Sequence, residues 1–187
     1  MEVILASQSP RRKELMQHLH MPFVVRVADI DETMDREKSP FEEVARVSRK
    51  KAEAVPRTPE DVVIAADTIV VCDDVVLGKP ADEEDAFRML QMLSGRTHQV
   101  MTGLTVMKGQ RAISVTEVTD VHFRPLSQKE IYDYIATKEP MDKAGSYGIQ
   151  GGAAVFADRI EGDYYNVIGL PVCRLHSILK DLMEGTQ

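Results

Sequence analysis

The sequence predicts an α/β fold in which helices flank a mixed, strongly twisted central sheet. Three observations support this fold class. Strand-like and helix-like segments alternate in the first half of the chain, and two long strand-like segments follow at residues 99–107 and 112–123. Residues 61–72 form the most apolar and β-branched run in the sequence. Such a run is typical of a strand that is buried on both faces.

The composition predicts one globular domain over residues 1–187. The net charge of −7 argues against general binding of nucleic acid over the protein surface, so we expect no stable nucleic-acid partner.

Cys72 and Cys173 lie in apolar runs without metal-ligand spacing, so both are expected to be reduced core thiols of a cytoplasmic protein. We expect no signal peptide, because Met1 leads directly into a predicted strand, and no membrane association, because no apolar run approaches 18 residues.

Four predicted helices begin at a residue whose side chain can accept a hydrogen bond from a free backbone N–H. The four candidate N-caps are Ser9, Ser39, Asp82 and Ser127. A proline follows the first two caps, and a glutamate three residues after Ser39 and after Ser127 indicates a capping box. A last helix is expected to begin at Pro171.

The remaining segments are predicted to be strands. Short strands are expected at residues 3–6 and 23–27, and residues 75–80 are expected to return as a hairpin arm beside the central run. Residues 153–156 and 164–169 predict two further strands joined by a turn at residues 161–163. His98 follows the turn at Gly95, where a histidine is expected to be a structural hydrogen-bonding residue more often than a catalytic one.

Asp67 is the first candidate for a functional residue, because it is an acid inside the buried central run. An unpaired carboxylate there is costly, so it must be paired, hydrated or bound to a metal ion. Ala65 and Ala66 leave room beside it, and Lys79 follows after a short turn. We predict that Asp67 is catalytic and holds a metal ion; the alternative is an acid that bonds local backbone amides.

The start of the first helix is a candidate anion site. Ser7 and Ser9 supply hydroxyls, and Arg11 and Arg12 lie in the first turn, where positive charge opposes the helix dipole. Free backbone amides and arginines together suit phosphate oxygens. The alternative is a pair of solvated surface arginines.

The loop after residues 23–27 contains three acids, Asp29, Asp31 and Glu32. Carboxylate oxygens suit Mg²⁺ and Mn²⁺, so Glu32 is predicted to be the second metal ligand. A solvated acidic loop is the alternative. In the next helix, most basic residues are explained by the helix dipole, and Lys51 is the one expected to turn inward.

A glycine-rich segment at residues 142–152 predicts close approach of the backbone to a ligand. Lys143 offers a phosphate contact, and the amide of Gln150 suits the edge of a nucleotide base. The segment is not a Walker A loop, which requires Gly-Lys-Ser/Thr directly before a helix.

Six blocks of the chain resemble the Maf family, whose members are septum-formation-inhibitor-like nucleoside triphosphate pyrophosphatases. In order, they are residues 5–12 (LASQSPRR), 66–68 (ADT), 78–80 (GKP), 94–98 (SGRTH), 142–151 (DKAGSYGIQG) and 166–171 (NVIGLP). They span nearly the whole chain. The resemblance implies a two-lobed fold akin to the inosine triphosphate pyrophosphatases, with a cleft between the lobes. It also implies cleavage of a nucleoside triphosphate to the monophosphate and pyrophosphate with a divalent cation, Mg²⁺ or Mn²⁺.

The resemblance also assigns residues. Asp67 matches the proposed proton acceptor of the family. The matching charged positions of the cleft are Glu32, Lys51 and Lys79. Arg11, Thr68 and Gln150 match three positions that separate substrate branches. The branch that acts on 7-methyl-GTP has tryptophan, glutamine and glutamate there, so this chain looks like the dTTP/UTP branch.

Together, the residues and the resemblance predict metal-assisted attack of water on dTTP or UTP. Glu32 and Asp67 are expected to hold the ion, and Asp67 to orient or deprotonate the water. The predicted phosphate-binding residues are Ser7, Arg11, Arg12, Lys51, Lys79 and Lys143. Two alternatives stay open: a non-catalytic nucleotide or nucleic-acid binding regulator of cell division, and a pyrophosphatase for modified nucleotides. A homodimer is plausible for such an enzyme.

Overall fold

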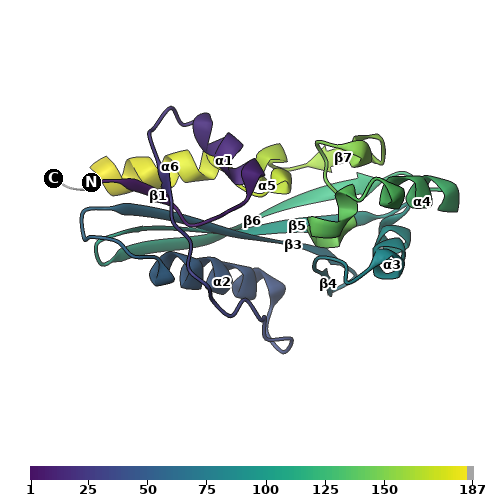
Figure 1. The fold of residues 1–187 in the computed structure, drawn as a ribbon, viewed down its shortest axis with the longest axis horizontal. Coiled ribbons are helices and arrows are strands. Elements are labelled where there is room, and N and C mark those ends of the chain that lie inside the picture. The colour runs from purple at the N-terminus through teal and green to yellow at the C-terminus, as the bar shows by residue number, and fades with distance from the viewer. Residues whose placement is uncertain (185–187) are drawn as a thin grey trace. The chain divides into compact units, whose positions relative to one another are not determined.

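The computed structural model describes residues 1–184, and Figure 1 shows its elements. Within these residues, seven strands form one mixed, twisted sheet in the order β2-β1-β3-β5-β6-β7, with β4 paired to β3. The strands are β1 (Val3–Leu5), β2 (Val24–Val25), β3 (Val62–Cys72), β4 (Val75–Leu77), β5 (Thr97–Lys108), β6 (Arg111–Phe123) and β7 (Ala157–Glu161). The α-helices are α1 (Pro10–Gln17), α2 (Pro40–Ala54), α3 (Glu83–Leu93), α4 (Gln128–Ala136), α5 (Tyr164–Ile168) and α6 (Val172–Glu184). The predicted α/β class is therefore confirmed.

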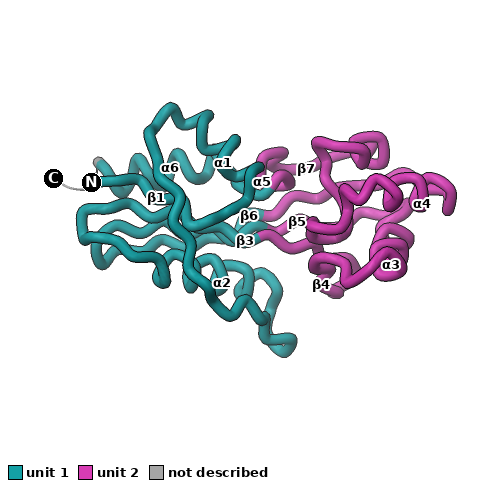
Figure 2. The backbone as a smooth tube through the Cα atoms, in the orientation of Figure 1, with its two compact units in different colours: residues 1–67, 102–117, 169–187 teal, residues 68–101, 118–168 magenta. Residues whose placement is uncertain are grey.

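The chain forms two compact units, which Figure 2 colours separately. Unit 1 contains residues 1–67, 102–117 and the segment from residue 169 onward, and unit 2 contains residues 68–101 and 118–168. The long strands β3, β5 and β6 contribute residues to both units. The expected assignment of residues 1–187 to one domain stays a prediction, as does the expected cleft.

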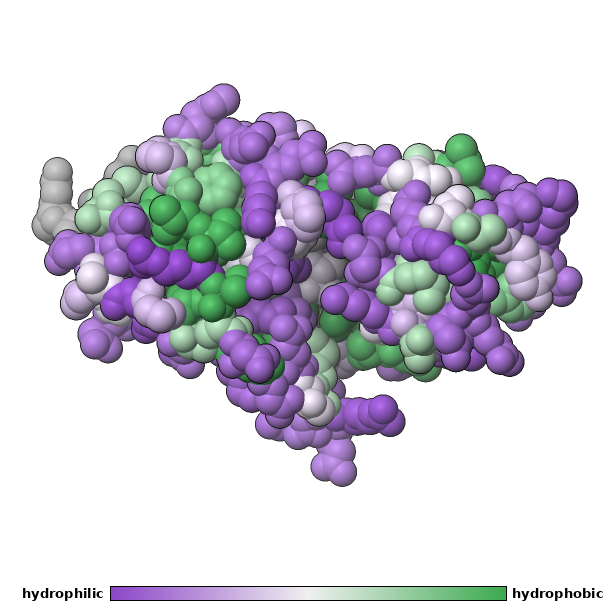
Figure 3. Space-filling model, in the orientation of Figure 1, coloured by the Kyte–Doolittle hydropathy of each residue, from purple (hydrophilic) through white to green (hydrophobic). Residues whose placement is uncertain are grey.

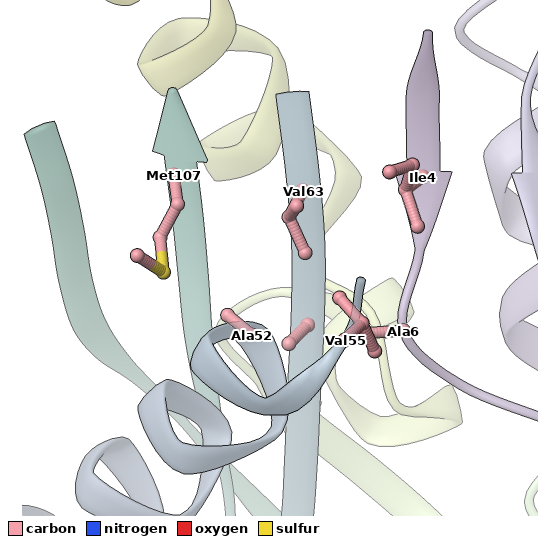
Figure 4. Packing of buried hydrophobic residues seen from close by; sticks show 7 residues of the cluster. Ile4, Ala6, Ala52, Val55, Val63 and Met107 are labelled. Atoms are coloured by element: carbon pink, nitrogen blue, oxygen red, sulfur yellow. The ribbon is translucent and has the colours of Figure 1, made fainter. Parts of the chain in front are cut away.

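In unit 1, strands β1, β2 and β3 are parallel, and β1 pairs with β3 through Val3 with Val62 and Leu5 with Ile64. Helix α2 covers one face of these strands, and α1 and α6 lie on the other face (Figure 1). Because side chains alternate along a strand, Val63 and Ala65 point to the α2 face. There they pack with Ile4 and Ala6 of the β1 segment, Met107 of β5, and Ala52 and Val55 at the end of α2 (Figure 4).

Helix α2 lies very close to strand β5, and Gly103 makes this approach possible. An ideal Cβ built on Gly103 would lie 2.2 Å from the carbonyl oxygen of Val44, a contact that real Cβ atoms do not make. Beside it, the buried Ser48 hydroxyl of α2 bonds the hydroxyl of Thr105 on β5 at 2.8 Å. These contacts fix α2 on the sheet, and α2 carries Lys51.

In unit 2, helices α3 and α4 pack together through the stacked rings of Phe87 and Tyr132, whose centroids are 4.7 Å apart. Both predicted caps form: Asp82 accepts from the backbone N–H of Asp85, and Ser127 and Glu130 make a complete capping box. The predicted hairpin of residues 75–80 is confirmed in β4, which pairs antiparallel with β3.

Two predicted strands are wrong. Residues 152–155 form a 3₁₀ turn (η3, Gly152–Val155), and the next strand, β7, begins only at Ala157. A short apolar run does not distinguish a strand from a turn. Residues 164–168 form helix α5, because the carboxylate of Asp163 accepts hydrogen bonds from the backbone N–H groups of Tyr165 and Asn166. Asp163 is an N-cap signal that the strand prediction overlooked.

Two smaller predictions also change. Ser39 precedes α2, but within residues 1–184 its side chain makes no capping hydrogen bond, so the expected capping box with Glu42 does not form. Cys72 is buried as expected, whereas Cys173 is exposed. Cys173 lies in the first turn of α6, where the helical period turns Leu175, Ile178 and Leu179 inward and leaves Cys173 outside.

Hydrophilic residues cover most of the face shown in Figure 3, with smaller hydrophobic areas between them. Among residues 1–184, no helix combines the length and the apolar character that crossing a bilayer requires.

Candidate functional site

Asp67 interrupts an otherwise buried strand. Every residue of β3 is buried except Asp67 and Thr68, which are partly exposed. Strand β1 ends at Leu5, opposite Ile64, so β3 continues past the carboxyl end of its parallel neighbour before it reaches Asp67. The carboxyl ends of parallel strands are the usual place for ligand sites in α/β sheets. By alternation, Asp67 points to the same face as Ala65, which is the face that α2 covers.

Lys51 of α2 is the partner of Asp67. Its ammonium Nζ lies 2.7 Å from Oδ1 of Asp67 and 2.9 Å from Oε2 of Glu32. The side chains of Lys51 and Asp67 are 14% and 13% exposed, whereas that of Glu32 is 58% exposed. The structure thus brings together three residues singled out in the sequence, and Lys51 turns inward as expected. Asp67 therefore has an ion-pair partner from another element, and the alternative of an acid bonded only to local backbone amides does not hold.

The loop that carries Glu32 is tied to α2 by a pair that the sequence analysis missed. The buried Glu43 accepts a hydrogen bond from the backbone N–H of Asp35, and Arg46 donates to the carbonyl of Thr33. Both contacts hold the stretch of loop that directly follows Glu32. The detectable signal was the spacing of Glu43 and Arg46, which places them on one side of a helix.

The start of α1 forms the expected cluster of hydroxyls and arginines. Ser9 caps the helix, and the buried Ser7 accepts hydrogen bonds from the backbone N–H of Ser9 and from Nη1 of Arg12 at 3.2 Å. The Nε–H of Arg12 also donates to the carbonyl of Gly169 at 2.7 Å. Arg12 is therefore held in place by directed bonds, and Arg11 lies beside it, half-buried.

Arg12 also belongs to the electrostatic surroundings of the carboxylates. Burial lowers the pKa of Arg12, and the negative charges of Asp67 and Glu32 act in the opposite direction. The positive charge of Arg11 adds to the lowering. Arg11, Arg12 and Lys51 thus lie in unit 1 together with Asp67 and Glu32.

The other predicted site residues lie in unit 2. Lys79 is exposed just after β4, and Gln150 is exposed in the glycine-rich segment. Lys143 is directed into its own segment, where Nζ donates to the carbonyl of Glu139 and to the carboxylate of Asp142. Thr68 follows Asp67 directly, so the two side chains leave β3 on opposite faces.

The glycine-rich segment packs closely against other residues of unit 2, whereas the expected approach of its backbone to a ligand stays a prediction. The backbone N–H of Gly145 donates to the carbonyl of Gly78, and an ideal Cβ on Gly145 would lie 2.8 Å from the side chain of Val70. The carboxylate of Glu139 accepts from the backbone N–H of Gly152. This carboxylate lies so close to Gly151 that a side chain there would overlap it.

His98 is a structural residue, as expected. It is 2% exposed, and its Nε2 lies 2.7 Å from the hydroxyl of Tyr147. The rings of Phe123 and Tyr147 pack edge-on against it. Burial, followed by the charge of His122, lowers the pKa of His98 to about 4, so the ring is neutral at physiological pH.

The donor set fits a hard divalent cation. Two carboxylates already converge on one positive charge, and Mg²⁺ sites commonly use one or two carboxylates together with water and substrate phosphates. Among the residues that the structure describes, no cluster of three or more His, Cys, Asp and Glu side chains could hold a metal ion by itself. Glu32 and Asp67 are therefore the candidate ligands, with the remaining positions left to water and phosphate oxygens.

The chain is similar to known proteins over nearly its whole length. The family model described as Maf-like protein matches residues 2–182. A protein of Bacillus cytotoxicus named dTTP/UTP pyrophosphatase is 50% identical over 183 residues, which is 97% of this chain and 96% of that protein. A protein of Symbiobacterium thermophilum with the same name is 51% identical over 179 residues, covering 95% and 92% of the two chains.

A solved structure is also similar. The HAM1 protein of Coxiella burnetii matches with a TM-score of 0.51 at 16% identity, covering 97% of this chain and 99% of that one. At this identity the likeness concerns the fold alone.

Proposed function

The chain belongs to the Maf family, and we propose that it hydrolyses dTTP and UTP to the nucleoside monophosphate and pyrophosphate. The observation that carries this proposal is the convergence of Glu32 and Asp67 on one cation beside the arginines of α1. The relatives named dTTP/UTP pyrophosphatase match nearly the whole chain, and the three branch-separating positions, Arg11, Thr68 and Gln150, carry the residues expected of that branch.

Hydrolysis of a phosphate anhydride needs neutralised charge and an aligned nucleophile, with little covalent participation by the protein. Asp67 is proposed to orient the attacking water and to take its proton; its partial exposure, in the middle of an otherwise buried strand, supports this role. We assign Glu32 and Asp67 as ligands of Mg²⁺ or Mn²⁺, which when bound supplies charge neutralisation and a polarised water.

The cations of α1 and α2 suit the triphosphate. Arg12 is held by Ser7 and Gly169, so its guanidinium is preorganised, and Arg11 lies beside it at the helix start. Preorganised guanidinium groups lose little entropy when they bind phosphate oxygens. Lys79 and Lys143 are further proposed phosphate contacts; for Lys143 this requires exchange of its bonds to Glu139 and Asp142.

Base recognition is assigned to Gln150. Its amide both donates and accepts hydrogen bonds, as the carbonyl and N–H edge of thymine or uracil requires. A site built on such bonds rejects bases with a different pattern, because mismatched polar groups are left unpaired. The expected homodimer and the cytoplasmic location stay predictions.

The function is tested with the purified protein, Mg²⁺ and a panel of triphosphates: dTTP, UTP, dCTP, ATP, GTP, 7-methyl-GTP and modified pyrimidine nucleotides. We expect dTTP and UTP to yield monophosphate and pyrophosphate. In isotopically labelled water, the label should enter the monophosphate, because the attack is at the α-phosphorus. Binding without turnover would support a non-catalytic regulator instead, and label in the pyrophosphate would refute attack at the α-phosphorus.

A further inference from the structure

We propose that Lys51 is a built-in competitor of the divalent cation: its ammonium pairs with Glu32 and Asp67 in the ion-free protein and must give up these contacts when the ion binds. The inference rests on the proposed metal-dependent function and adds a form of regulation to it. Lys51 thereby sets how much free cation the site needs.

The contacts of one nitrogen atom carry the proposal. Nζ of Lys51 is within 2.9 Å of a carboxylate oxygen on each of two side chains that come from different parts of the chain. An ammonium has three N–H donors and no acceptor, so it can satisfy both carboxylates at once. Glu32 and Asp67 are also the two candidate metal ligands, so the lysine and the ion need the same oxygens.

Charge explains why both cations cannot share these oxygens easily. The two carboxylates and Lys51 carry a net charge of −1, and a divalent ion added to all three would bring the group to +1. Without Lys51, the same ion would leave the group neutral. Because Lys51 and Asp67 are largely shielded from solvent, repulsion between the ammonium and the ion is screened less than at an open surface.

The flexible stem of lysine makes the exchange possible. Arg12 is fixed by directed bonds to the carbonyl of Gly169 and the hydroxyl of Ser7, so it cannot leave without losing both. Lys51 is a point charge on a four-carbon chain, and the two carboxylates with which it pairs both belong to the site. Once Lys51 leaves the two carboxylates, its ammonium can bind phosphate oxygens. Binding of the ion therefore favours binding of the triphosphate.

The test measures Mn²⁺ binding without nucleotide, by the electron paramagnetic resonance signal of free Mn²⁺. The variant is Lys51→Met, and the matched control is Lys50→Met, which removes the same charge from an exposed neighbour. We expect Lys51→Met to bind Mn²⁺ about tenfold more tightly than wild type, the scale of one partly shielded ion pair. Lys50→Met should change the affinity less than about twofold.

Two further variants locate the effect. Lys51→Gln should also bind Mn²⁺ more tightly, and the double variant Lys51→Met/Glu32→Gln should lose the gain. In EDTA, Lys51→Met should melt below Lys50→Met, because two carboxylates then face each other without a cation, and Mn²⁺ should raise its melting temperature more than that of wild type.

Equal or weaker Mn²⁺ binding by Lys51→Met, or a gain just as large in Lys50→Met, would overturn the competition. A protein that binds no Mn²⁺ in any variant would overturn it as well. Pyrophosphate release by wild type is assayed separately, so failure of the proposed hydrolysis is distinguishable from failure of this inference.

Discussion

Glu43 and Arg46 are joined by two parallel hydrogen bonds, from Nε to Oε1 at 2.7 Å and from Nη2 to Oε2 at 2.6 Å. Both are charge-assisted, and the carboxylate is almost fully buried. The same two side chains bind the backbone of Thr33 and Asp35, in the segment that directly follows Glu32. The pair therefore fixes a loop whose carboxylate belongs to the candidate site.

Replacing Glu43 with glutamine should lower both stability and metal affinity. The amide cannot accept both bonds from Arg46 together with that from Asp35, and hydrogen bonds to charged groups are worth roughly 1.5–3 kcal/mol each. We expect a loss of about 2 kcal/mol in the free energy of unfolding, measured in urea, and weaker Mn²⁺ binding. Glu53→Gln is the control, since Glu53 pairs with Arg49 at the exposed surface of the same helix and should cost little. Equal losses in the two variants would argue against the role of Glu43.

His98 should make the protein sensitive to mild acid. Its pKa is about 4 in the folded protein against 6.5 in an unfolded chain, so the unfolded state binds more protons between these values. The contribution of neutral His98 to the free energy of unfolding is therefore fully present above pH 6.5. It is lost as the pH drops toward 4, by about 3 kcal/mol in all.

Urea unfolding at a series of pH values checks this. His98→Gln should flatten the profile in that range, whereas His176→Gln, at an exposed position, should leave its slope unchanged. A profile of the same steepness in His98→Gln would refute the assignment.

Gly103 should not tolerate even a methyl group. In Gly103→Ala the new Cβ would meet the backbone of Val44, so α2 must move and Lys51 with it. We expect a loss of about 3 kcal/mol or more in unfolding free energy. Gly78→Ala is the matched control, because among the described residues no heavy atom lies within 4 Å of its Cβ position. Circular dichroism melts of both variants would show the contrast, and similar melting temperatures would contradict it.

Gln150 should control the choice of nucleotide without affecting the metal. Gln150→Glu loses the donor and adds a negative charge, so we expect kcat/KM for dTTP and UTP to fall about tenfold or more. Affinity for Mn²⁺ without nucleotide should stay the same. Gln128→Glu adds the same charge at an exposed helix start and should leave kcat/KM unchanged. An unaltered preference across the nucleotide panel would remove Gln150 from base recognition.

Local signals in the sequence predicted much of the fold. The buried run of β3, the caps at Ser9, Asp82 and Ser127, and the hairpin into β4 all depend on residues close together in the chain. The errors at residues 153–156 and 164–169 arose where a short apolar run was weighed more heavily than a turn or the cap at Asp163.

The arrangement of the site depends on contacts between residues that lie far apart in the chain, so less of it could be predicted. Asp67 could be chosen because a carboxylate in a buried strand needs a partner, and Lys51 because it could turn inward. That one ammonium bridges Asp67 and Glu32 could not be predicted, since it depends on how α2 packs on the sheet. The bonds of Glu43 and Arg46 to the loop after Glu32 could not be predicted either. Their partners are backbone groups, which every residue has, so no residue type in the loop indicates them.

The central claim is that Asp67 activates water for hydrolysis of the nucleotide. The most direct test is single-turnover release of pyrophosphate from dTTP by wild type, Asp67→Asn and the exposed control Asp74→Asn. We predict that Asp67→Asn slows release about a hundredfold or more while Asp74→Asn behaves as wild type. Release by Asp67→Asn within about threefold of wild type would contradict the account.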